Sequence, residues 1–300
     1  MSATHVAAVR AVDANRAPHR PGERRRKAGR IALSTFGIVL SLVWIFPVYW
    51  MVLSAFTPNA WLRTTTPEFL PVHATVNNFK RAMDASFFNA LKMSTIITIV
   101  AVVAVLAFAF LAALAISRWR FRGRASFILA VLFIQMLPAE GLFIAQYKML
   151  SNANLLNSVL GISVLYIAAI IPFTVWMLRG FVAGVPADLE EAAMVDGLSR
   201  FQAFLRITFP LLAPGLVASG VYAFLQAWNE FTIAVVALPS NSSQTLPLWL
   251  RNFLTASAQR GVDWGQVMAA STLIAIPVII FFLLVQNRMT SGLVSGAVKG

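Results

Sequence analysis

Acidic side chains gather at the start of a polar segment that separates two strongly apolar stretches. Pro186 precedes this cluster, and proline suits the first turn of a helix, where its missing N–H is not needed. Carboxylates in that turn are favoured by the positive end of the helix dipole, and they can pair with basic groups of another protein. Alanines beside them leave the helix smooth enough for close approach. We therefore predict a docking helix whose contact residues are Glu190, Glu191, Ala192, Ala193, Asp196 and Gly197.

A second short helix is expected directly after the first. Gly197 can adopt the positive φ that ends a helix, and Ser199 with Gln202 forms a capping-box pattern that starts another. Pro210 lacks an N–H and is expected to end that second helix. The segment 186–210 is therefore predicted to form two short helices around a glycine corner, with an ordinary amphipathic loop as the alternative.

The sequence offers no pattern for catalysis, nucleotide binding or metal binding. None of its lysines follows a glycine, so the Gly-Lys-Ser/Thr end of a P-loop is missing. It has no cysteine, its three histidines lie outside apolar stretches, and no His, Asp and Glu residues have metal-ligand spacing. We predict no catalytic residue, metal site or cofactor in this chain, which is then not an enzyme. If ATP hydrolysis drives the activity of this protein, the ATP and Mg²⁺ must bind a separate ATPase.

Composition places most of the chain in a lipid bilayer. Of the 300 residues, 59% are hydrophobic and 12% are charged, and the mean hydropathy is +0.75. Backbone groups in lipid must be hydrogen-bonded internally, and a span needs about 20 apolar residues, so apolar runs of this length are expected to be helices. The sequence predicts an all-α integral membrane protein with six transmembrane helices, at about 31–57, 88–117, 126–147, 157–181, 212–237 and 266–286. Kinks are expected at Pro47, Pro138, Pro172 and Pro277.

The distribution of Lys and Arg predicts which loops face the cytoplasm. With the N-terminus inside, 17 of the 24 Lys and Arg residues fall on the cytoplasmic side and 7 on the other, in line with the positive-inside rule. Both termini and the 186–210 loop are thus expected in the cytoplasm. The predicted parts are a disordered basic tail at 1–30, the six-helix transmembrane domain at 31–290 and a cytoplasmic C-terminal tail at 291–300.

Two other interpretations of the basic residues are disfavoured. A cleaved signal peptide is the rival to an uncleaved first span, but the apolar run is too long and lacks a small-residue cleavage site. Nucleic-acid binding would suit a net charge of +13, but this charge is dispersed among short loops with no folded soluble domain to present it.

Polar residues inside the predicted spans could line a path for a solute, because such groups are costly in lipid and usually face the interior of a bundle. In the fifth span, four of them recur at i, i+4, i+7 and i+8, on one helical face. Hydrogen bonding between helices, with no role in a path, is the alternative. The candidate path residues are Glu140, Tyr222, Gln226, Asn229 and Glu230.

Several motifs resemble those of one family. Glu191-Ala192-Ala193, Gly197 and Ile207-Thr208-Phe209-Pro210 match the cytoplasmic loop of bacterial ABC importer permeases, Glu-Ala-Ala-x3-Gly-x9-Ile-x-Leu-Pro, with Phe209 in place of Leu. Trp228-Asn229-Glu230-Phe231 and the ending at 292–300 narrow the resemblance to carbohydrate-importer permeases of the binding-protein-dependent ABC class. The chain looks most like the smaller membrane subunit of the maltose transporter. A second departure is Met93-Ser94, where relatives often have Asn-Ser.

This resemblance implies a permease subunit of an ATP-driven importer in the bacterial inner (cytoplasmic) membrane, forming half of the pathway for a sugar or oligosaccharide. The implied partners are a second homologous permease, two copies of a cytoplasmic ABC ATPase and an extracytoplasmic solute-binding lipoprotein or periplasmic protein, besides the sugar and membrane lipid. The 186–210 loop would couple to the ATPase, the 238–265 loop would enter the binding protein, and the C-terminal tail would reach between the ATPase subunits. The alternatives are a permease for glycerol phosphate, a polyol or another small solute, and a secondary transporter.

Overall fold

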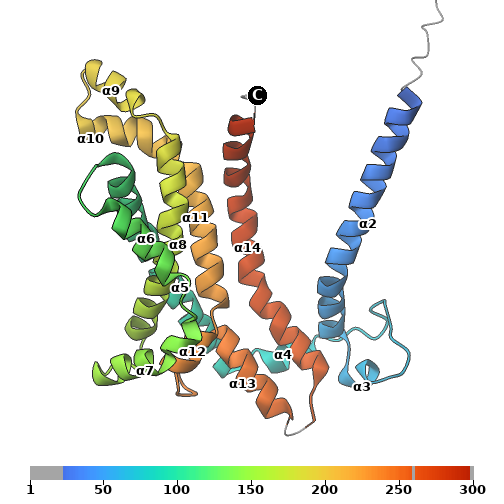
Figure 1. Ribbon diagram of the computed structural model, residues 1–300. Helices are drawn as coiled ribbons and strands as arrows, with labels where there is room; N and C mark the ends of the chain where they lie inside the picture. The colour runs from blue at the N-terminus through green and yellow to red at the C-terminus, as the bar shows by residue number, and fades with distance from the viewer. Residues whose placement is uncertain (1–22, 259–260, 298–300) are drawn as a thin grey trace, which may run out of the picture. The chain divides into compact units, whose positions relative to one another are not determined.

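The computed structural model describes residues 23–258 and 261–297, and these residues form helices without strands (Figure 1). The chain divides into a first unit that ends at Val52 and a second that begins at Leu53. Helix α2 (Glu23–Phe56) crosses this boundary and carries an apolar stretch of membrane-spanning length, Gly29–Phe56. The predicted tail at 1–30 lies mostly outside the described residues, but residues 23–30 are helical, so the predicted disorder of that part is wrong.

The second unit contains the remaining helices, joined by short connections. Two short helices, α3 (Asn59–Leu62) and α4 (Asn77–Ala82), precede the long α5 (Ala85–Arg118). Then follow α6 (Arg124–Ile134), η1 (Ala139–Leu142), α7 (Phe143–Asn152), α8 (Val159–Gly184), α9 (Asp188–Val195), α10 (Arg200–Ala203) and η2 (Phe204–Thr208). The last are α11 (Phe209–Asn229), α12 (Thr232–Ala237), α13 (Leu246–Ala258) and α14 (Trp264–Ala297).

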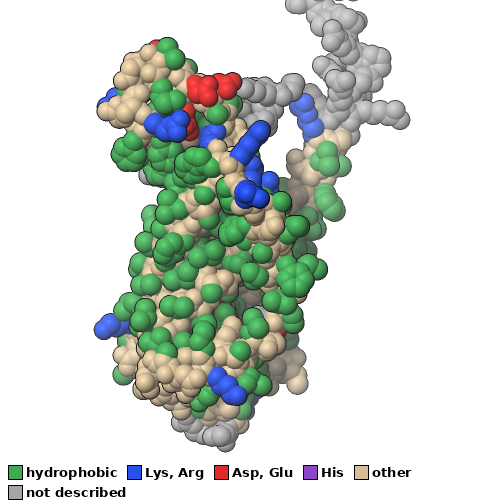
Figure 2. Space-filling view, turned by 60° about the vertical axis from the view of Figure 1, so that its left-hand side comes forward, with side chains coloured by type: hydrophobic (Ala, Val, Ile, Leu, Met, Phe, Trp, Pro, Cys, Tyr) green, Lys and Arg blue, Asp and Glu red, His purple; other side chains and the backbone are tan. Residues whose placement is uncertain are grey.

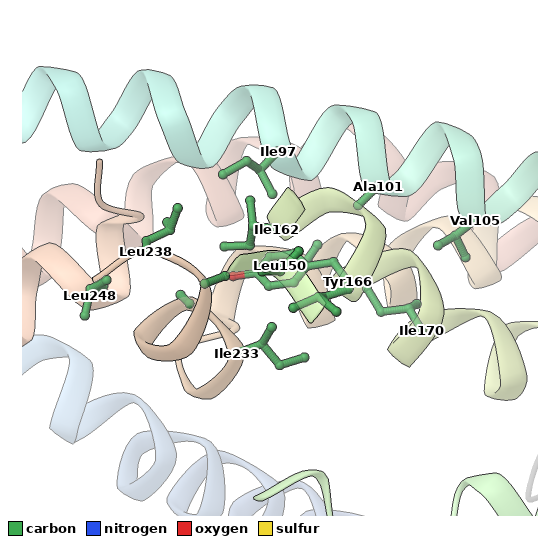
Figure 3. Close-up of a cluster of buried hydrophobic side chains, with 14 of the residues drawn as sticks. Ile97, Ala101, Val105, Leu150, Ile162, Tyr166, Ile170, Ile233, Leu238 and Leu248 are labelled. Carbon is green, nitrogen blue, oxygen red and sulfur yellow. The ribbon is translucent and has the colours of Figure 1, made fainter. Parts of the chain in front are cut away.

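Helices α5, α8 and α11 pack together as the centre of this unit. Small apolar residues recur every four positions along α5, at Ala101, Val105, Ala109 and Ala113, and all four are fully buried. In lipid, helices associate by close packing rather than by a hydrophobic driving force, and small residues allow that approach. Figure 3 shows the outcome: side chains of α5 lie beside Ile162 of α8, and Ile233 of α12 and the following Leu238 belong to the same cluster.

Within the part of the chain that the structure describes, five helices are long and apolar enough to cross a membrane, and a sixth crossing is available as a bent pair. The third span was expected as one helix at 126–147 with a kink at Pro138. Instead, α6 ends before Pro138, and η1 and α7 continue at 92° to it. Pro138 has an extended backbone (ψ 124°), and the residue before a proline is also pushed out of the helical region. The chain is therefore broken at this point rather than kinked, while the predicted fold class of an all-α protein with up to six spans is confirmed.

The helix that starts at the capping box does not end before Pro210, so that expectation is wrong. From Arg200 to Asn229 the chain is one apolar helix of membrane-spanning length, which includes the π-helical turn η2. In this turn Phe209 donates its N–H to the carbonyl of Phe204, five residues back. The wider turn changes the hydrogen-bond register directly before Pro210, so the missing proline N–H is accommodated and the helix continues.

The predicted fifth span, 212–237, is wrong at its C-terminal end, because α11 ends at Asn229 and α12 is a separate helix. Glu230 has an extended backbone (φ −67°, ψ 125°) between the two. Within the second unit, α9 and α10 lie at the same end as the last turns of α14, and α4, α12 and α13 lie at the opposite end (Figure 1). We call these the α9 end and the α13 end.

Candidate functional site

Helix α9 presents one exposed face at the α9 end. Asp188, Glu191, Ala192 and Val195 occupy positions i, i+3, i+4 and i+7, which share one side of a helix, and all four are exposed. Val195 is 87% exposed, an unusual state for a β-branched apolar side chain that lies outside the long apolar helices. This docking face therefore combines two carboxylates with an alanine and a valine, a surface that another protein could cover.

The opposite side of α9 is turned into the protein. Ala193 is 7% exposed, and Glu190, three residues earlier on the same side, accepts a hydrogen bond of 2.6 Å from the hydroxyl of Thr208. The same carboxylate oxygen lies 3.5 Å from the guanidinium of Arg118, the last residue of α5. Glu190 and Ala193 thus contact this chain's own helices, whereas the exposed members of the predicted set are Glu191, Ala192, Asp196 and Gly197.

Gly197 closes the corner between the two short helices. Its φ is +93°, in the left-handed region that favours glycine. Its N–H binds the carbonyl of Met194 and the next N–H, from Leu198, binds that of Ala193, a pair of bonds known as a Schellman motif. On the other side, the Ser199 hydroxyl and the Gln202 side chain cap each other's backbone, so the predicted capping box is confirmed.

Further apolar side chains are exposed on the helices around the glycine corner. Phe201 of α10 is 70% exposed, and Leu189 of α9 and Leu205 of η2 are also exposed. On the face drawn in Figure 2, acidic side chains gather at the α9 end, whereas hydrophobic side chains cover the middle of the molecule. Sequence reasoning missed these apolar contact residues, although the exposed positions of a short amphipathic helix could have indicated them.

The candidate path residues are only partly brought together. Tyr222 and Gln226 lie one turn apart on α11, where the Gln226 amide donates to the Tyr222 hydroxyl at 3.0 Å. Asn229 is exposed and donates its amide to the carbonyl of Leu225 within the same helix. Glu140 is exposed on η1, in the break of the third span. No distance places Glu140 beside the α11 residues, so the shared polar cavity stays a prediction.

Glu230 does not lie on the face that the other three residues were expected to share, because α11 ends before it. Its carboxylate accepts hydrogen bonds from the backbone N–H groups of Ile233 (2.7 Å) and Ala234 (3.1 Å), so it caps α12. Its own carbonyl accepts a bond from the hydroxyl of Tyr166 in α8. These contacts give Glu230 a structural task at the helix break.

A polar cavity of about 590 Å³ lies at the α13 end. Side chains from two long loops, 58–87 and 238–265, line it. Among them are Arg81, Asp84, Asn241, Asn252 and Asp263. Arg81 and Asp263 form an ion pair of 3.5 Å there, and Trp249 of α13 donates its indole N–H to the hydroxyl of Ser86. The family resemblance assigned a role to the loop 238–265, but the sequence did not indicate that residues of 58–87 line the same cavity.

The helices from α5 to α14 match a known protein family. Residues 106–293 match the family model described as binding-protein-dependent transport system inner membrane component. The match covers most of the chain and includes the two-helix corner and the α11–α12 break. The chain belongs to this family, a class of multi-pass inner-membrane permeases, and the predicted family and localisation are confirmed.

Relatives of known name agree over nearly the full length. The chain is 43% identical, over 92% of its length and 100% of the relative, to the diacetylchitobiose uptake system permease protein DasC of Streptomyces coelicolor. It is 32% identical, over 90% of its length and 97% of the relative, to the trehalose/maltose transport system permease protein MalG of Thermococcus litoralis.

A solved structure shares the fold. It is a chain of a bacterial ABC transporter involved in the import of the acidic polysaccharide alginate, with a TM-score of 0.72 and 24% identity over 90% of this chain and 99% of that one. A second structure, of the alginate transporter in complex with a periplasmic protein bound to an alginate pentasaccharide, gives a TM-score of 0.60 at 15% identity over 87% of this chain and 95% of that one.

Proposed function

We propose that this chain is the permease subunit of an ATP-driven importer for a sugar or short oligosaccharide, and that the docking face on α9 and α10 receives a separate ABC ATPase. The observation that carries the proposal is the exposed row of Asp188, Glu191, Ala192 and Val195 beside a fixed glycine corner. Exposed carboxylates can pair with basic groups of a partner, and exposed apolar side chains at such a site are buried by complex formation.

The partners follow from the position of this face. Two ATPase copies, a second homologous permease that supplies the other half of the pathway, and ATP with Mg²⁺ in the ATPase complete the proposed importer. The positive-inside bias puts the α9 end in the cytoplasm. The α13 end, with its polar cavity, then faces outward, where a solute-binding protein would dock.

A carbohydrate substrate is favoured by the relatives, whose names state uptake of diacetylchitobiose and of trehalose or maltose. Closure of the ATPase pair would move α9, and the bundle would alternate between inward-facing and outward-facing states. In this mechanism the chain carries no chemical step itself. It contributes a pathway half and a mechanical connection between that half and the ATPase.

Copurification tests the docking face. The tagged chain is expressed with its genomic ATPase, partner permease and binding protein, and ATPase activity is measured with and without the sugar-loaded binding protein. Glu191→Lys should abolish both copurification of the ATPase and the stimulation, while the matched charge reversal Glu68→Lys at the α13 end should leave copurification unchanged. Full copurification and stimulation with Glu191→Lys would contradict the proposed face.

Uptake by a deletion strain identifies the substrate. Labelled diacetylchitobiose, trehalose, maltose and glycerol 3-phosphate are offered to cells with and without the gene. Uptake of a sugar that depends on the gene supports the proposal. Uptake of glycerol 3-phosphate alone would overturn the carbohydrate assignment and favour the small-solute alternative.

A further inference from the structure

Glu190 lies next to the docking face but points in the opposite direction, into the transmembrane helices. Its side chain is 21% exposed, and the side chain of its partner Arg118 is 19% exposed. Its second partner, Thr208, is fully buried. One carboxylate oxygen thus connects three segments: the docking helix α9, the C-terminal end of α5 and the π-helical turn that leads into α11.

Arg118 depends on this carboxylate. Among the described residues, its Nε and Nη2 atoms are buried without a hydrogen-bond acceptor, and its ion pair is with Glu190. A partly buried guanidinium that loses its counter-charge is costly, more so than a fully solvated one. Because both side chains are mostly buried, this ion pair is screened less by solvent than an exposed surface pair, and it favours the present position of α9 relative to α5.

The third segment, the π-helical turn η2, is hydrogen-bonded to the same carboxylate. Thr208 is the last residue of the π-helical turn, and its hydroxyl donates a 2.6 Å bond to the charged oxygen of Glu190. Ring contacts also hold this turn against α5. The ring centroid of Phe110 lies 6.2 Å from that of Phe204 and 6.0 Å from that of Phe209. A displacement of α9 that keeps these bonds must therefore move the start of α11 as well, and α11 carries Tyr222 and Gln226.

We infer that Glu190 is a positioning residue that transmits movement of the docking helix to α5 and α11 through Arg118 and Thr208, and that it is not a contact to the ATPase. This inference rests on the proposed function, because it assigns a route to the coupling between the ATPase and the pathway. Neighbouring acids then have separate tasks. Glu191 binds the ATPase, and Glu190 transmits the displacement of α9 to α5 and α11.

The test compares ATP hydrolysis with sugar import by the complete importer in proteoliposomes, using whichever of diacetylchitobiose, trehalose or maltose the unaltered complex imports. Thr208→Val removes the hydroxyl, and Thr208→Ser retains it. Glu190→Gln keeps an acceptor for Thr208 but removes the charge that pairs with Arg118. Thr255→Val is the control: this exposed threonine of α13 donates its hydroxyl to the backbone carbonyl of Arg251 rather than to a carboxylate.

Loss of the Thr208 hydrogen bond in Thr208→Val, or of the ion pair with Arg118 in Glu190→Gln, should raise the ATP consumed per imported sugar by about tenfold. Thr208→Ser and Thr255→Val should keep the ratio of the unaltered complex. Copurified ATPase should be unchanged in all four, because the docking face is intact. A purely structural role would instead lower the amount of complex and both activities together, with the ratio unchanged.

Unchanged ratios in both Thr208→Val and Glu190→Gln would overturn the inference while the import by the unaltered complex upholds the proposed function. Loss of ATPase copurification in Glu190→Gln would also overturn it, since Glu190 would then belong to the docking face. If Thr208→Val fails to assemble, Glu190→Gln and Arg118→Gln give the same readout. Failure of the unaltered complex to import any of the sugars would overturn both claims.

Discussion

Glu190 and Glu191 are adjacent in the sequence and differ in every structural respect that matters for their task. A helix turns by about 100° per residue, so adjacent side chains leave it in different directions. Glu190 faces Arg118 and Thr208, while Glu191 is exposed on the docking face. Two acidic side chains that look equivalent in the sequence therefore have different surroundings. Substitutions at the two positions should produce different defects.

Substitution of Gly197 tests how much the corner depends on the left-handed backbone conformation of this residue. A Cβ at this position would meet no atom within 4 Å, so a substitution is opposed by the positive φ alone. Gly197→Val should introduce strain of about 1–3 kcal/mol and slow sugar import by the assembled complex. Gly197→Asn, which tolerates this conformation better, should retain most of the import rate. Equal import by the two variants would show that the corner need not be held in this geometry.

Substitution of Glu230 tests whether this half-buried acid at the helix break is a cap or a path residue. Glu230→Ala removes both acceptors of the α12 N–H groups and should reduce the free energy of unfolding by about 1–2 kcal/mol. The matched Asn229→Ala, which removes one bond within α11, should leave the thermal denaturation midpoint in detergent nearly unchanged. A normal midpoint for Glu230→Ala combined with lost import would contradict the cap and favour a path.

At the scale of elements, the molecule depends on places where helices are interrupted. The π-helical turn η2 lets the chain pass Pro210, the extended Pro138 separates α6 from α7, and the extended Glu230 separates α11 from α12. Two of these interruptions, η2 and Glu230, lie at the two ends of the long helix α11. The long helices between them can then move as rods, while the interruptions absorb changes of angle.

The contact between α8 and α11 requires a glycine. A Cβ on Gly215 would overlap the side chain of Phe181, whereas one on Gly180 in α8 would meet nothing within 4 Å. Gly215→Val should therefore force the helices apart and reduce the free energy of unfolding by about 1–3 kcal/mol. Gly180→Ala should be neutral or slightly stabilising. Thermal denaturation in detergent measures both, and equal midpoints would contradict the close packing of α8 on α11.

Sequence reasoning was most successful where a rule acts locally. The helical fold class, the Gly197 corner and the Ser199 capping box each follow from hydropathy or from the preference of a single residue type. It failed where tertiary contacts decide. The π-helical turn before Pro210 and the inward direction of Glu190 both depend on α5, whose relevant residues are far away in the sequence, and the broken fifth span depends on a carboxylate that caps the next helix.

At the scale of the whole molecule, the second unit has two ends with different surfaces. The α9 end carries the proposed docking face, and the α13 end carries the polar cavity lined by both long loops. In the proposed importer, these ends would face opposite sides of the membrane, with the α9 end inside.

The absence of cysteine from the sequence allows a direct test of this topology. Single cysteines are introduced at Val195 and at Ser242, both exposed, and intact cells are treated with a membrane-impermeant maleimide. Ser242→Cys should react in intact cells, and Val195→Cys should react only after the membrane is opened. The reverse pattern would contradict a cytoplasmic docking face.

The central claim is that a separate ATPase drives sugar import through the docking face. The most direct measurement is uptake of labelled sugar by proteoliposomes that contain the complete importer, with ATP inside and the solute-binding protein outside. We expect accumulation that requires both ATP and the binding protein and that is lost with Glu191→Lys. Accumulation without ATP, or undiminished accumulation with Glu191→Lys, would contradict it.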